Sequence, residues 1–490
     1  MRGFYLALSL TCMVVALKAQ STFGTIVGSV RDASGAAVPA ATIKVRELDK
    51  NTTQTAVSDD EGLYELLDLK PGRYEITATK SGFSTFTVPE IVLPGRETVR
   101  ADIRLELEPV RESVVVTGVA AIINTENGTI SDTKSFRQVT ELPLNYRGVT
   151  TSPLAALMTV PGVQQDLGNQ PSIGGGLPAQ VEYSLDGIST ANIRQFGPLS
   201  EMYTSTEMLS EFKVISVNNN AEYGQMGDVT VITRGGANQL HGSALWYHQN
   251  AALDATIYGA PEKQAKVFNT FGGSFSGPVY LPKLYRGRDR TFFFFDYEGN
   301  RKPSTSVEQL SVPTASMRAG DLNGLPGGSA VDPLSGSPFP DNVIPTTRIN
   351  SVAHTLLTKF YPLQNYDAGG TTDTNYRPLV SDTIDTDGYD IRVDHVLSSR
   401  QQIFGRWTWK KISSLGINDL LPPSNEDELY RNLIVSHNII LRPNLINEFR
   451  FGLSLFLGRE RFPIPGASAV ATLGLKGLNL SNVQATGGFP

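Results

Sequence analysis

Cysteine is almost absent from this sequence of 490 residues, which contains only Cys12. Because Cys12 lies within the first twenty residues, removal of that segment excludes a disulfide framework, a zinc–thiolate site and a thiol nucleophile. Charged residues make up only 18 % of the chain, and the formal net charge of −6 argues against a nucleic-acid partner. No run of about 18 apolar residues follows the N-terminal segment, so a membrane role would require a β-barrel.

The first 19 residues have the features of a secretory signal peptide. Arg2 supplies a positive charge, Phe4–Leu17 is apolar, and Ala19 is the small residue before the expected cleavage site. An uncleaved anchor helix is the alternative, although the apolar run is short for a membrane span. We therefore expect the rest of the chain to leave the cytoplasm. Its length corresponds to about three domains.

Residues 20–108 have the pattern of a small β-sandwich. In Arg96–Leu107, apolar residues alternate with charged ones, as in a half-buried strand. Turn-forming residues separate this segment from other short strands, a spacing typical of a sandwich. The other expected strands are Gly24–Arg31, Ala41–Leu48, Thr53–Ser58, Leu63–Leu66 and Arg73–Thr79.

Two segments of this region carry a family resemblance. GTIVGSVRDASGAAVPAATIKVRELD and DDEGLYELLDLKPGRYEITATKSGF resemble the carboxypeptidase regulatory-like domain. The resemblance implies a transthyretin-like β-sandwich with Val30, Val38, Tyr64 and Tyr74 in its core. Such a domain could be a structural spacer or a module that binds a sugar or a protein partner. The residues favour the spacer, because no exposed aromatic platform is evident.

The last part of the chain has strands of a different kind. In Gln402–Lys411, Trp407 and Trp409 share one face, while Arg406 and Lys410 share the other. Leu445–Leu457 likewise alternates between Phe or Leu and polar residues. A run of about ten residues with one apolar and one polar face fits a tilted strand of an outer-membrane barrel.

The connections between these strands differ in length. Leu397–Gln401 and Leu441–Asn444 are expected to be tight turns, whereas Ser413–Asn432 is expected to contain a longer polar excursion. Ser311–Tyr366 is longer still and is expected to form a large extracellular loop with a short helix over Asn350–Phe360. Short turns on one side and long loops on the other are typical of such barrels.

Segments beyond the first domain resemble TonB-dependent receptors of the Oar-like class. They include VEYSLDGIST (Val181–Thr190), Glu211–Ala255 and Phe271–Arg301, and their order carries the resemblance. It implies an all-β chain with a transthyretin-like sandwich, a mixed α/β plug and a partial transmembrane antiparallel β-barrel. The implied boundaries are a signal peptide at 1–19, the regulatory-like domain at 20–108, the plug at 109–236 and an incomplete barrel at 237–490.

The same resemblance implies a segment that contacts TonB, the energy-transducing protein of the inner membrane. Such a segment adds a strand to its partner. The candidate lies between the first domain and the plug; the alternative is that Val114–Val116 is the first plug strand. The candidate TonB box consists of Glu112, Ser113, Val114, Val115, Val116 and Thr117.

No enzyme chemistry is expected. The five histidines lie outside zinc-binding motifs, and the sequence contains no G-x-S-x-G elbow and no Walker A motif. We therefore assign no catalytic, cofactor-binding or metal-binding residue. Only 254 residues follow Gly236, fewer than a barrel of about 22 strands needs, so a C-terminally truncated fragment is expected.

The resulting expectation is an outer-membrane transporter whose N-terminal domain lies in the periplasm. Its partners would be TonB, outer-membrane lipid and a bulky ligand, whether an oligosaccharide, a peptide or an iron chelate. The alternative is an envelope carbohydrate-binding or adhesion protein that the barrel only anchors.

Overall fold

The computed structural model describes most of the chain between residues 21 and 476. The described ranges are 21–107, 116–117, 128–141, 152–165, 171–192, 198–199, 202–219, 225–255, 263, 265–325, 328–366, 374–416, 424–442, 445–461 and 466–476. Among these residues, no helix is long and apolar enough to span a membrane.

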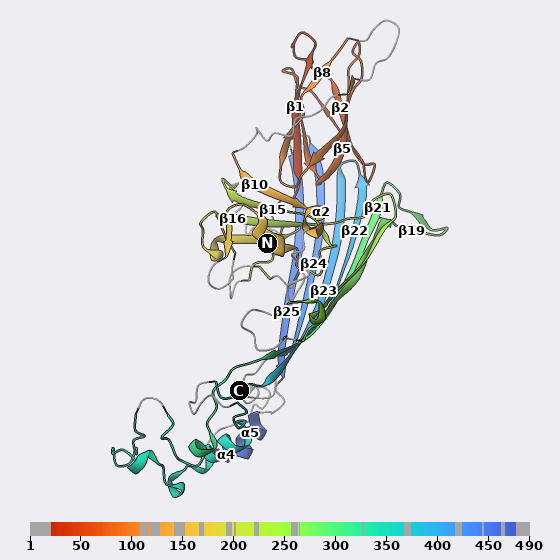
Figure 1. Ribbon diagram of the computed structural model, residues 1–490. Helices are drawn as coiled ribbons and strands as arrows, with labels where there is room; N and C mark the ends of the chain where they lie inside the picture. The colour runs from red at the N-terminus through yellow and green to blue at the C-terminus, as the bar shows by residue number, and fades with distance from the viewer. Residues whose placement is uncertain are drawn as a thin grey trace, which may run out of the picture.

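Residues 21–107 form a β-sandwich, here called the N-terminal domain (Figure 1). One sheet has the order β4-β1-β7, with β8 also pairing with β1, and the other has the order β3-β2-β5-β6-β9. The predicted core residues Val30, Val38, Tyr64 and Tyr74 are buried between the sheets. The strands are β1 (Gly24–Asp32), β2 (Thr42–Glu47), β3 (Thr53–Val57), β4 (Leu63–Leu69), β5 (Gly72–Thr79), β6 (Phe86–Leu93), β7 (Thr98–Arg100), β8 (Ile103–Leu105) and β9 (Val116–Thr117).

Two expectations for this domain require correction. Arg96–Leu107 forms two short strands, β7 and β8, which both pair in parallel with β1, and Leu107 is 72 % exposed. Strand β6 was not predicted from the sequence. It contains Pro89 followed by Glu90, both exposed, and its register against β5 shifts between Tyr74 and Ile76. Such a bulge breaks the period-two pattern on which strand prediction depends.

The described residues between 128 and 233 form a mixed domain, here called the central domain. Its five-stranded sheet has the order β10-β15-β16-β13-β14, in which β13 and β16 are parallel and the other pairs are antiparallel. Tyr183, Phe212 and Val231 are among its fully buried core residues. The elements are β10 (Ile130–Ser135), α2 (Phe136–Glu141), η1 (Pro153–Thr159), β11 (Val163–Gln165), β12 (Pro171–Ile173), η2 (Pro178–Gln180), β13 (Val181–Leu185), β14 (Ile188–Ser189), β15 (Leu209–Val217) and β16 (Gly227–Thr233).

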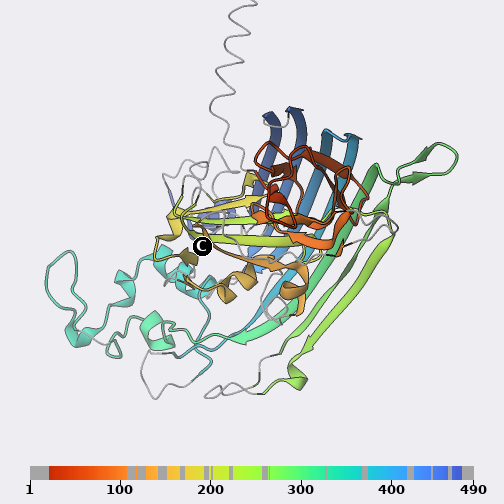
Figure 2. The ribbon, with the colours of Figure 1, turned by 90° about the horizontal axis from the view of Figure 1, so that it is seen from above.

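The remaining long strands form one antiparallel sheet, here called the wall, with the order β17-β18-β21-β22-β23-β24-β25. Seen from above, the wall curves around one side of the central domain (Figure 2). Its strands are β17 (His241–Asn250), β18 (Val267–Pro278), β21 (Thr291–Val307), β22 (Leu379–Ser398), β23 (Gln401–Gly416), β24 (Ser424–Arg442) and β25 (Leu445–Arg461). Short elements between or beside them are η4 (Ala251–Leu253), β19 (Tyr280–Leu281), β20 (Tyr285–Arg286), α3 (Ala315–Arg318), η5 (Pro340–Asn342), η6 (Thr346–Arg348), α4 (Ser351–Lys359) and α5 (Gly466–Leu473).

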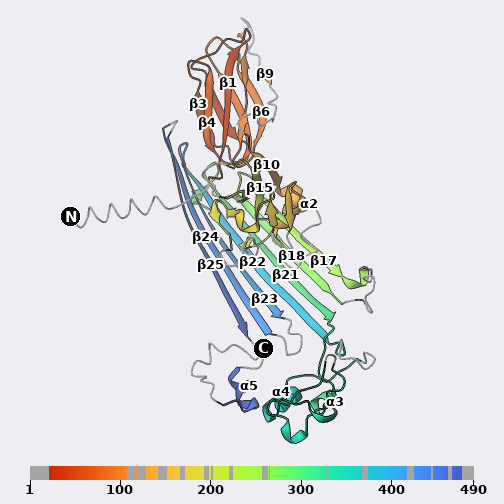
Figure 3. The ribbon, with the colours of Figure 1, turned by 90° about the vertical axis from the view of Figure 1, so that its left-hand side faces the viewer.

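The connections of the wall follow the predicted asymmetry in part, because at the end with the tight turn β18 and β21 are joined by residues 279–290, which contain β19 and β20. Strands β22 and β23 meet in a tight turn at Ser398–Gln401, and the N-terminal domain lies at this end of the wall (Figure 3). The long segment with α3 and α4 lies at the opposite end, and α4 begins after Asn350, as predicted. The excursion expected at Ser413–Asn432 is shorter than predicted, because β23 extends to Gly416 and β24 begins at Ser424.

Candidate functional site

The two faces of the wall differ in chemistry. On β25, five Phe and Leu side chains of the outer face remain 44–59 % exposed. The opposite face buries polar and charged side chains, including Arg406, Thr408 and Lys410 of β23, each 1 % exposed. This arrangement confirms the alternation predicted for β23 and β25. It is also the pattern of a barrel strand with one face toward lipid. The exposed residues of β25 are Phe449, Phe451, Leu453, Leu455 and Leu457.

Asp186 of the central domain lies against this charged face. It occupies the two-residue turn between β13 and β14, where Asp186 and Gly187 have φ angles of 49° and 81°. An Asp-Gly pair suits such a turn, because both positions require positive φ. The Asp186 carboxylate lies 3.0 Å from Arg406 Nε and 3.5 Å from Arg392 Nη1. Its backbone carbonyl accepts a hydrogen bond from Arg450 Nη1 at 3.0 Å.

Three strands of the wall therefore direct arginines at one turn of the central domain. Asp186, Arg392 and Arg406 are all buried, and Thr233 of β16 donates its backbone N–H and its hydroxyl to the same carboxylate. Charges removed from water need paired and hydrogen-bonded partners. Within the wall, Arg392 also pairs with Asp394 and Arg406 with Asp390, whereas Asp186 reaches these arginines only while the central domain lies against the wall.

A second contact joins the segment before β15 to the wall. Asp296 and Asp390 lie directly opposite each other on β21 and β22, and both are buried. Like charges in such a pair repel each other. Hydroxyl groups of the central domain offset this repulsion, because Thr204 donates to Asp390 and Ser205 donates to Asp296 Oδ2 at 2.5 Å. Separation of the two domains would remove these donors.

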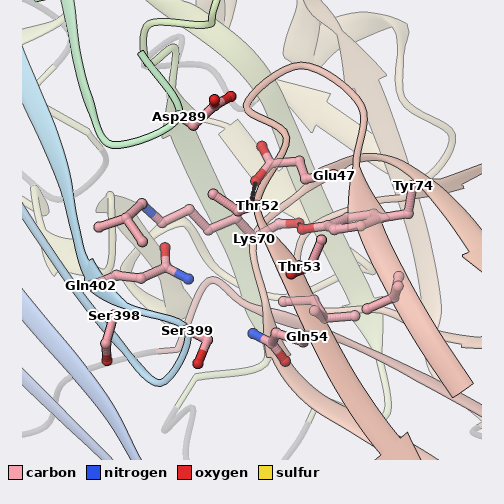
Figure 4. Close-up of a pocket in the computed structure, with 13 residues that line it drawn as sticks. Glu47, Thr52, Thr53, Gln54, Lys70, Tyr74, Asp289, Ser398, Ser399 and Gln402 are labelled. Carbon is pink, nitrogen blue, oxygen red and sulfur yellow. Dashed lines mark hydrogen bonds between the residues drawn. The ribbon is translucent and has the colours of Figure 1, made fainter. Parts of the chain in front are cut away.

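Cavities lie where the N-terminal domain meets the other two parts. One cavity of about 200 Å³ is lined by Lys70, Tyr74 and Thr53 of the sandwich and by Ser398 and other residues of the β22–β23 turn (Figure 4). A second cavity, of about 350 Å³, lies where the N-terminal domain, the central domain and the wall meet. The contact between the N-terminal domain and the wall is thus incompletely filled.

The candidate TonB box lies largely outside the described residues. Glu112, Ser113, Val114 and Val115 are not described, whereas Val116 and Thr117 form β9. Strand β9 pairs in parallel with Phe86 and Thr87 of β6, so it belongs to a sheet of the N-terminal domain. Its role remains a prediction.

Sequence reasoning located the polar face of the wall but not the residues that bind to it. The alternation marked Arg406 and Arg450 as inward-facing, yet it could not identify Asp186 as the partner. The Asp-Gly pair after a hydrophobic strand was the available signal for a tight turn. The contacts of Lys70 and Arg96 carried no local signal, because they join residues more than a hundred positions apart.

Two families match this chain. Residues 232–490 match the outer membrane beta barrel domain, and residues 25–106 match the carboxypeptidase regulatory-like domain. The first match covers more than half of the chain. The second covers nearly all of the N-terminal domain.

Individual relatives are more distant. The TonB-dependent transporter Oar of Myxococcus xanthus is 28 % identical over 277 residues, which are 53 % of this chain and 26 % of that protein. The match thus spans about a quarter of that relative. The outer membrane transporter YddB of Escherichia coli is 11 % identical, with a TM-score of 0.43 over 68 % of this chain and 40 % of that chain. A ferric enterobactin receptor variant of Pseudomonas aeruginosa is 12 % identical, with a TM-score of 0.37 over 69 % of this chain and 42 % of that chain.

Proposed function

Because this chain belongs to the outer membrane β-barrel domain family and is distantly homologous to a TonB-dependent transporter, we propose that it imports a bulky extracellular ligand with energy from TonB. In this proposal, residues 109–236 supply the plug, apart from β9, which pairs with the N-terminal domain, and residues 237–490 form barrel wall. Residues 20–108 lie in the periplasm. Proteins of this transporter family are not enzymes. No group of three or more potential metal ligands occurs in the described part of the chain.

The observation that carries this proposal is the position of Asp186. A lumen wide enough for a bulky ligand needs an occluding domain. The central domain lies against the polar face of the wall, and its Asp186 carboxylate is shared by Arg392 and Arg406. A polar contact of this kind can exchange protein partners for water, so it supports an occluding domain that moves rather than one fused into an apolar core.

The energy must reach the outer membrane by physical contact. An extended segment can add a strand to a partner protein and then transmit a pull. Glu112–Thr117 is our candidate for this segment, because it lies between the N-terminal and central domains. The described part of it, Val116–Thr117, already forms a strand.

Replacement of Glu112–Thr117 by a Gly–Ser linker of equal length tests the proposal. Uptake and surface binding would be measured in the native host with a radiolabelled maltooligosaccharide, a peptide mixture and a ferric chelate. For the probe that the unmodified protein binds, we expect uptake to fall at least about tenfold while binding is retained. A matched linker at Ala330–Ser335, in the segment between β21 and β22, controls for the replacement itself.

The alternative is an envelope carbohydrate-binding or adhesion protein that the barrel anchors. The same experiment separates the two functions. In an adhesion protein, replacement of Glu112–Thr117 would leave unchanged both the surface binding of the probe and the amount of probe that the cells hold. Unchanged uptake in the linker variant would contradict TonB-dependent transport.

A further inference from the structure

Two turns at one end of the N-terminal domain contact two different parts of the molecule. The turn between β4 and β5 contacts the wall. Its Lys70 Nζ lies 2.9 Å from Asp394 Oδ1, and the two side chains are only 11 % and 2 % exposed. Just before this turn, near the end of β4, Asp68 Oδ1 accepts a hydrogen bond of 2.8 Å from Asn438 Nδ2. The wall strands β22 and β24 are thereby joined to the N-terminal domain.

The turn between β6 and β7 contacts the central domain instead. Arg96 forms an ion pair with Asp228 of β16, and both side chains are buried. The Gly95 N–H donates to Glu211 Oε1 at 2.5 Å. Lys213 Nζ donates to the Gly95 carbonyl at 3.2 Å. A side chain at Gly95 would collide with the side chains of Ile232 and Glu211, so the turn packs closely against the central domain here.

At or beside each turn, a charged residue adopts a backbone conformation that favours glycine. Asp68 has a φ of 58° and Arg96 has a φ of 57°. Residues other than glycine are uncommon in this region and persist where the surroundings impose it. Glycine would relieve the backbone at either position but would lose the contact with Asn438 or with Asp228. The strained residues are the ones whose side chains bridge the domains.

The candidate TonB box is linked to the same turn. Strand β9, which is its C-terminal part, pairs with the start of β6. The other end of β6 leads directly into Pro94–Glu97, which contacts the central domain. A force applied to Glu112–Thr117 would therefore act on the strand that carries this turn.

We propose that the N-terminal domain is a latch that fastens the central domain to the wall, and that a pull on Glu112–Thr117 releases it. The first half of the proposal is independent of transport, whereas the second half rests on the proposed function. The contacts of the N-terminal domain with the wall and the central domain contain few buried ion pairs. Cavities of about 200 and 350 Å³ adjoin them, so these contacts can open. The latch lies in series, because the N-terminal domain fastens the central domain only while its contacts with both parts hold, and the contact with the wall also includes the hydrogen bond from Arg450 Nη2 to Thr22 Oγ1.

A thiol at the central domain–wall contact reports on the latch. Ser205 is fully buried and donates to Asp296, so a Ser205→Cys variant should react with a bulky maleimide only when the central domain leaves the wall. The experiment uses the full chain in outer-membrane vesicles, with Cys12→Ser in the background and with neither TonB nor ligand present.

We expect Lys70→Ala and Arg96→Ala each to raise the labelling rate at least about fivefold. The double variant should exceed the larger single effect by less than about twofold, because one open end already releases a latch in series. The matched control is Arg73→Ala, which removes an exposed cation of the same domain and should leave the rate unchanged. Unchanged rates in both single variants, or effects that multiply in the double variant, would overturn the latch.

Hydrogen exchange of β2 and β5 in the same variants shows whether the N-terminal domain remains folded. If these strands exchange as in the unmodified protein, faster labelling is due to undocking. If the alanine variants unfold the domain, Lys70→Met and Arg96→Met replace them, because methionine retains most of the aliphatic stem without the charge, and the same expectations apply.

The pull is tested separately in energised cells that contain TonB. There, the Gly–Ser linker in place of Glu112–Thr117 should return the labelling rate of Ser205→Cys to the value in vesicles. Equal rates for the linker variant and the unmodified segment in such cells would overturn the release step. The vesicle result for the latch would stand, so the two failures are distinguishable.

Discussion

The core of the N-terminal domain is built from apolar side chains such as Ile43 and Ile76, both fully buried, whereas the contact between the central domain and the wall buries Asp186, Arg392 and Arg406. Apolar burial stabilises a fold through area removed from water and has no need of specific partners. Buried charges contribute little net stability but tolerate no loss of a partner. The comparison shows that the first region depends on buried apolar area, whereas the second depends on specific charged partners that meet between the central domain and the wall.

The largest expected effect comes from breaking the charged contact. Asp186→Ala leaves Arg392 and Arg406 without the carboxylate they share. Within the wall, Arg392 keeps Asp394 and Arg406 keeps Asp390 as a partner, so the variant removes the interdomain partner of a buried charge cluster, which costs up to about 3–5 kcal/mol. We expect the central domain to leave the wall and cells to become sensitive to vancomycin, a large hydrophilic antibiotic. The minimal inhibitory concentration measures this effect.

The control for that variant is Asp332→Ala. Asp332 also pairs with an arginine, Arg348, but in the segment between β21 and β22 that lies away from the central domain. Cells with this variant should stay resistant. Full resistance in cells with Asp186→Ala would show that the charged cluster does not hold the central domain in place.

A smaller effect is expected from the apolar region. Ile76→Ala removes a fully buried side chain of β5 and should lower the free energy of unfolding of the N-terminal domain by about 2–5 kcal/mol. Hydrogen exchange of β2 and β5 in the whole chain, followed in increasing urea, measures this change. Val57→Ala, at a side chain that is 60 % exposed, should change it by no more than about 0.5 kcal/mol.

The contact between the N-terminal and central domains should depend on pH. Burial raises the pKa of Glu211 from 4.5 to about 7, against the effects of the Gly95 N–H and Lys213, while Glu97 adds to the rise. The docked state then binds a proton that the exposed state has lost. The contribution of Glu211 to the stability of the contact is therefore complete below pH 4.5. It is lost as the pH rises through 7, which lowers the stability by at most about 3 kcal/mol.

Hydrogen exchange at Gly95–Glu97 measures this dependence. We expect faster exchange at pH 8 than at pH 5.5, after correction for the intrinsic exchange rate. Glu211→Gln should flatten the difference, because glutamine does not titrate. A pH difference of the same size in the Gln variant would mean that another group, such as Lys213, governs the contact.

The smallest effect is expected on the outer face of the wall. The rings of Tyr389 and Trp409 stack with centroids 4.8 Å apart across β22 and β23. Trp409→Ala should cost about 0.5–1.5 kcal/mol beyond the lost apolar area. Thermal unfolding of the wall in detergent, followed by circular dichroism, measures the loss. Trp409→Phe should retain most of the stability, and an equal loss in both variants would contradict a role for stacking.

Most of the fold could be predicted because its signals are local. Alternating residues in β23 and β25 and turn-forming residues around β1 to β5 report on their own environment within a few positions. Strand β6 was missed because a bulge and Pro89 interrupt its alternation. The strands β23 and β24 were predicted too short, since the polar residues near Gly416 and Ser424 suit either a loop or a strand end above the membrane.

The candidate site was only half predictable. The sequence indicated that Arg406 and Arg450 point inward, because each alternates with apolar residues along its own strand. It gave no indication that Asp186, some two hundred positions earlier, is their partner. Likewise, nothing near Lys70 or Arg96 distinguishes them from solvated surface cations such as Arg73. Their roles depend on contacts across 324 and 132 positions of the chain.

By itself, the sequence determined the sandwich, the two-faced strands and the family, because side-chain periodicity and turn chemistry act between neighbours. Only the tertiary structure decided which charges meet: Asp186 with Arg392 and Arg406, Lys70 with Asp394, and Arg96 with Asp228. The physical reason is that ion pairing depends on distance and burial in space, and one sequence pattern of alternating charges is compatible with many partners until the domains dock.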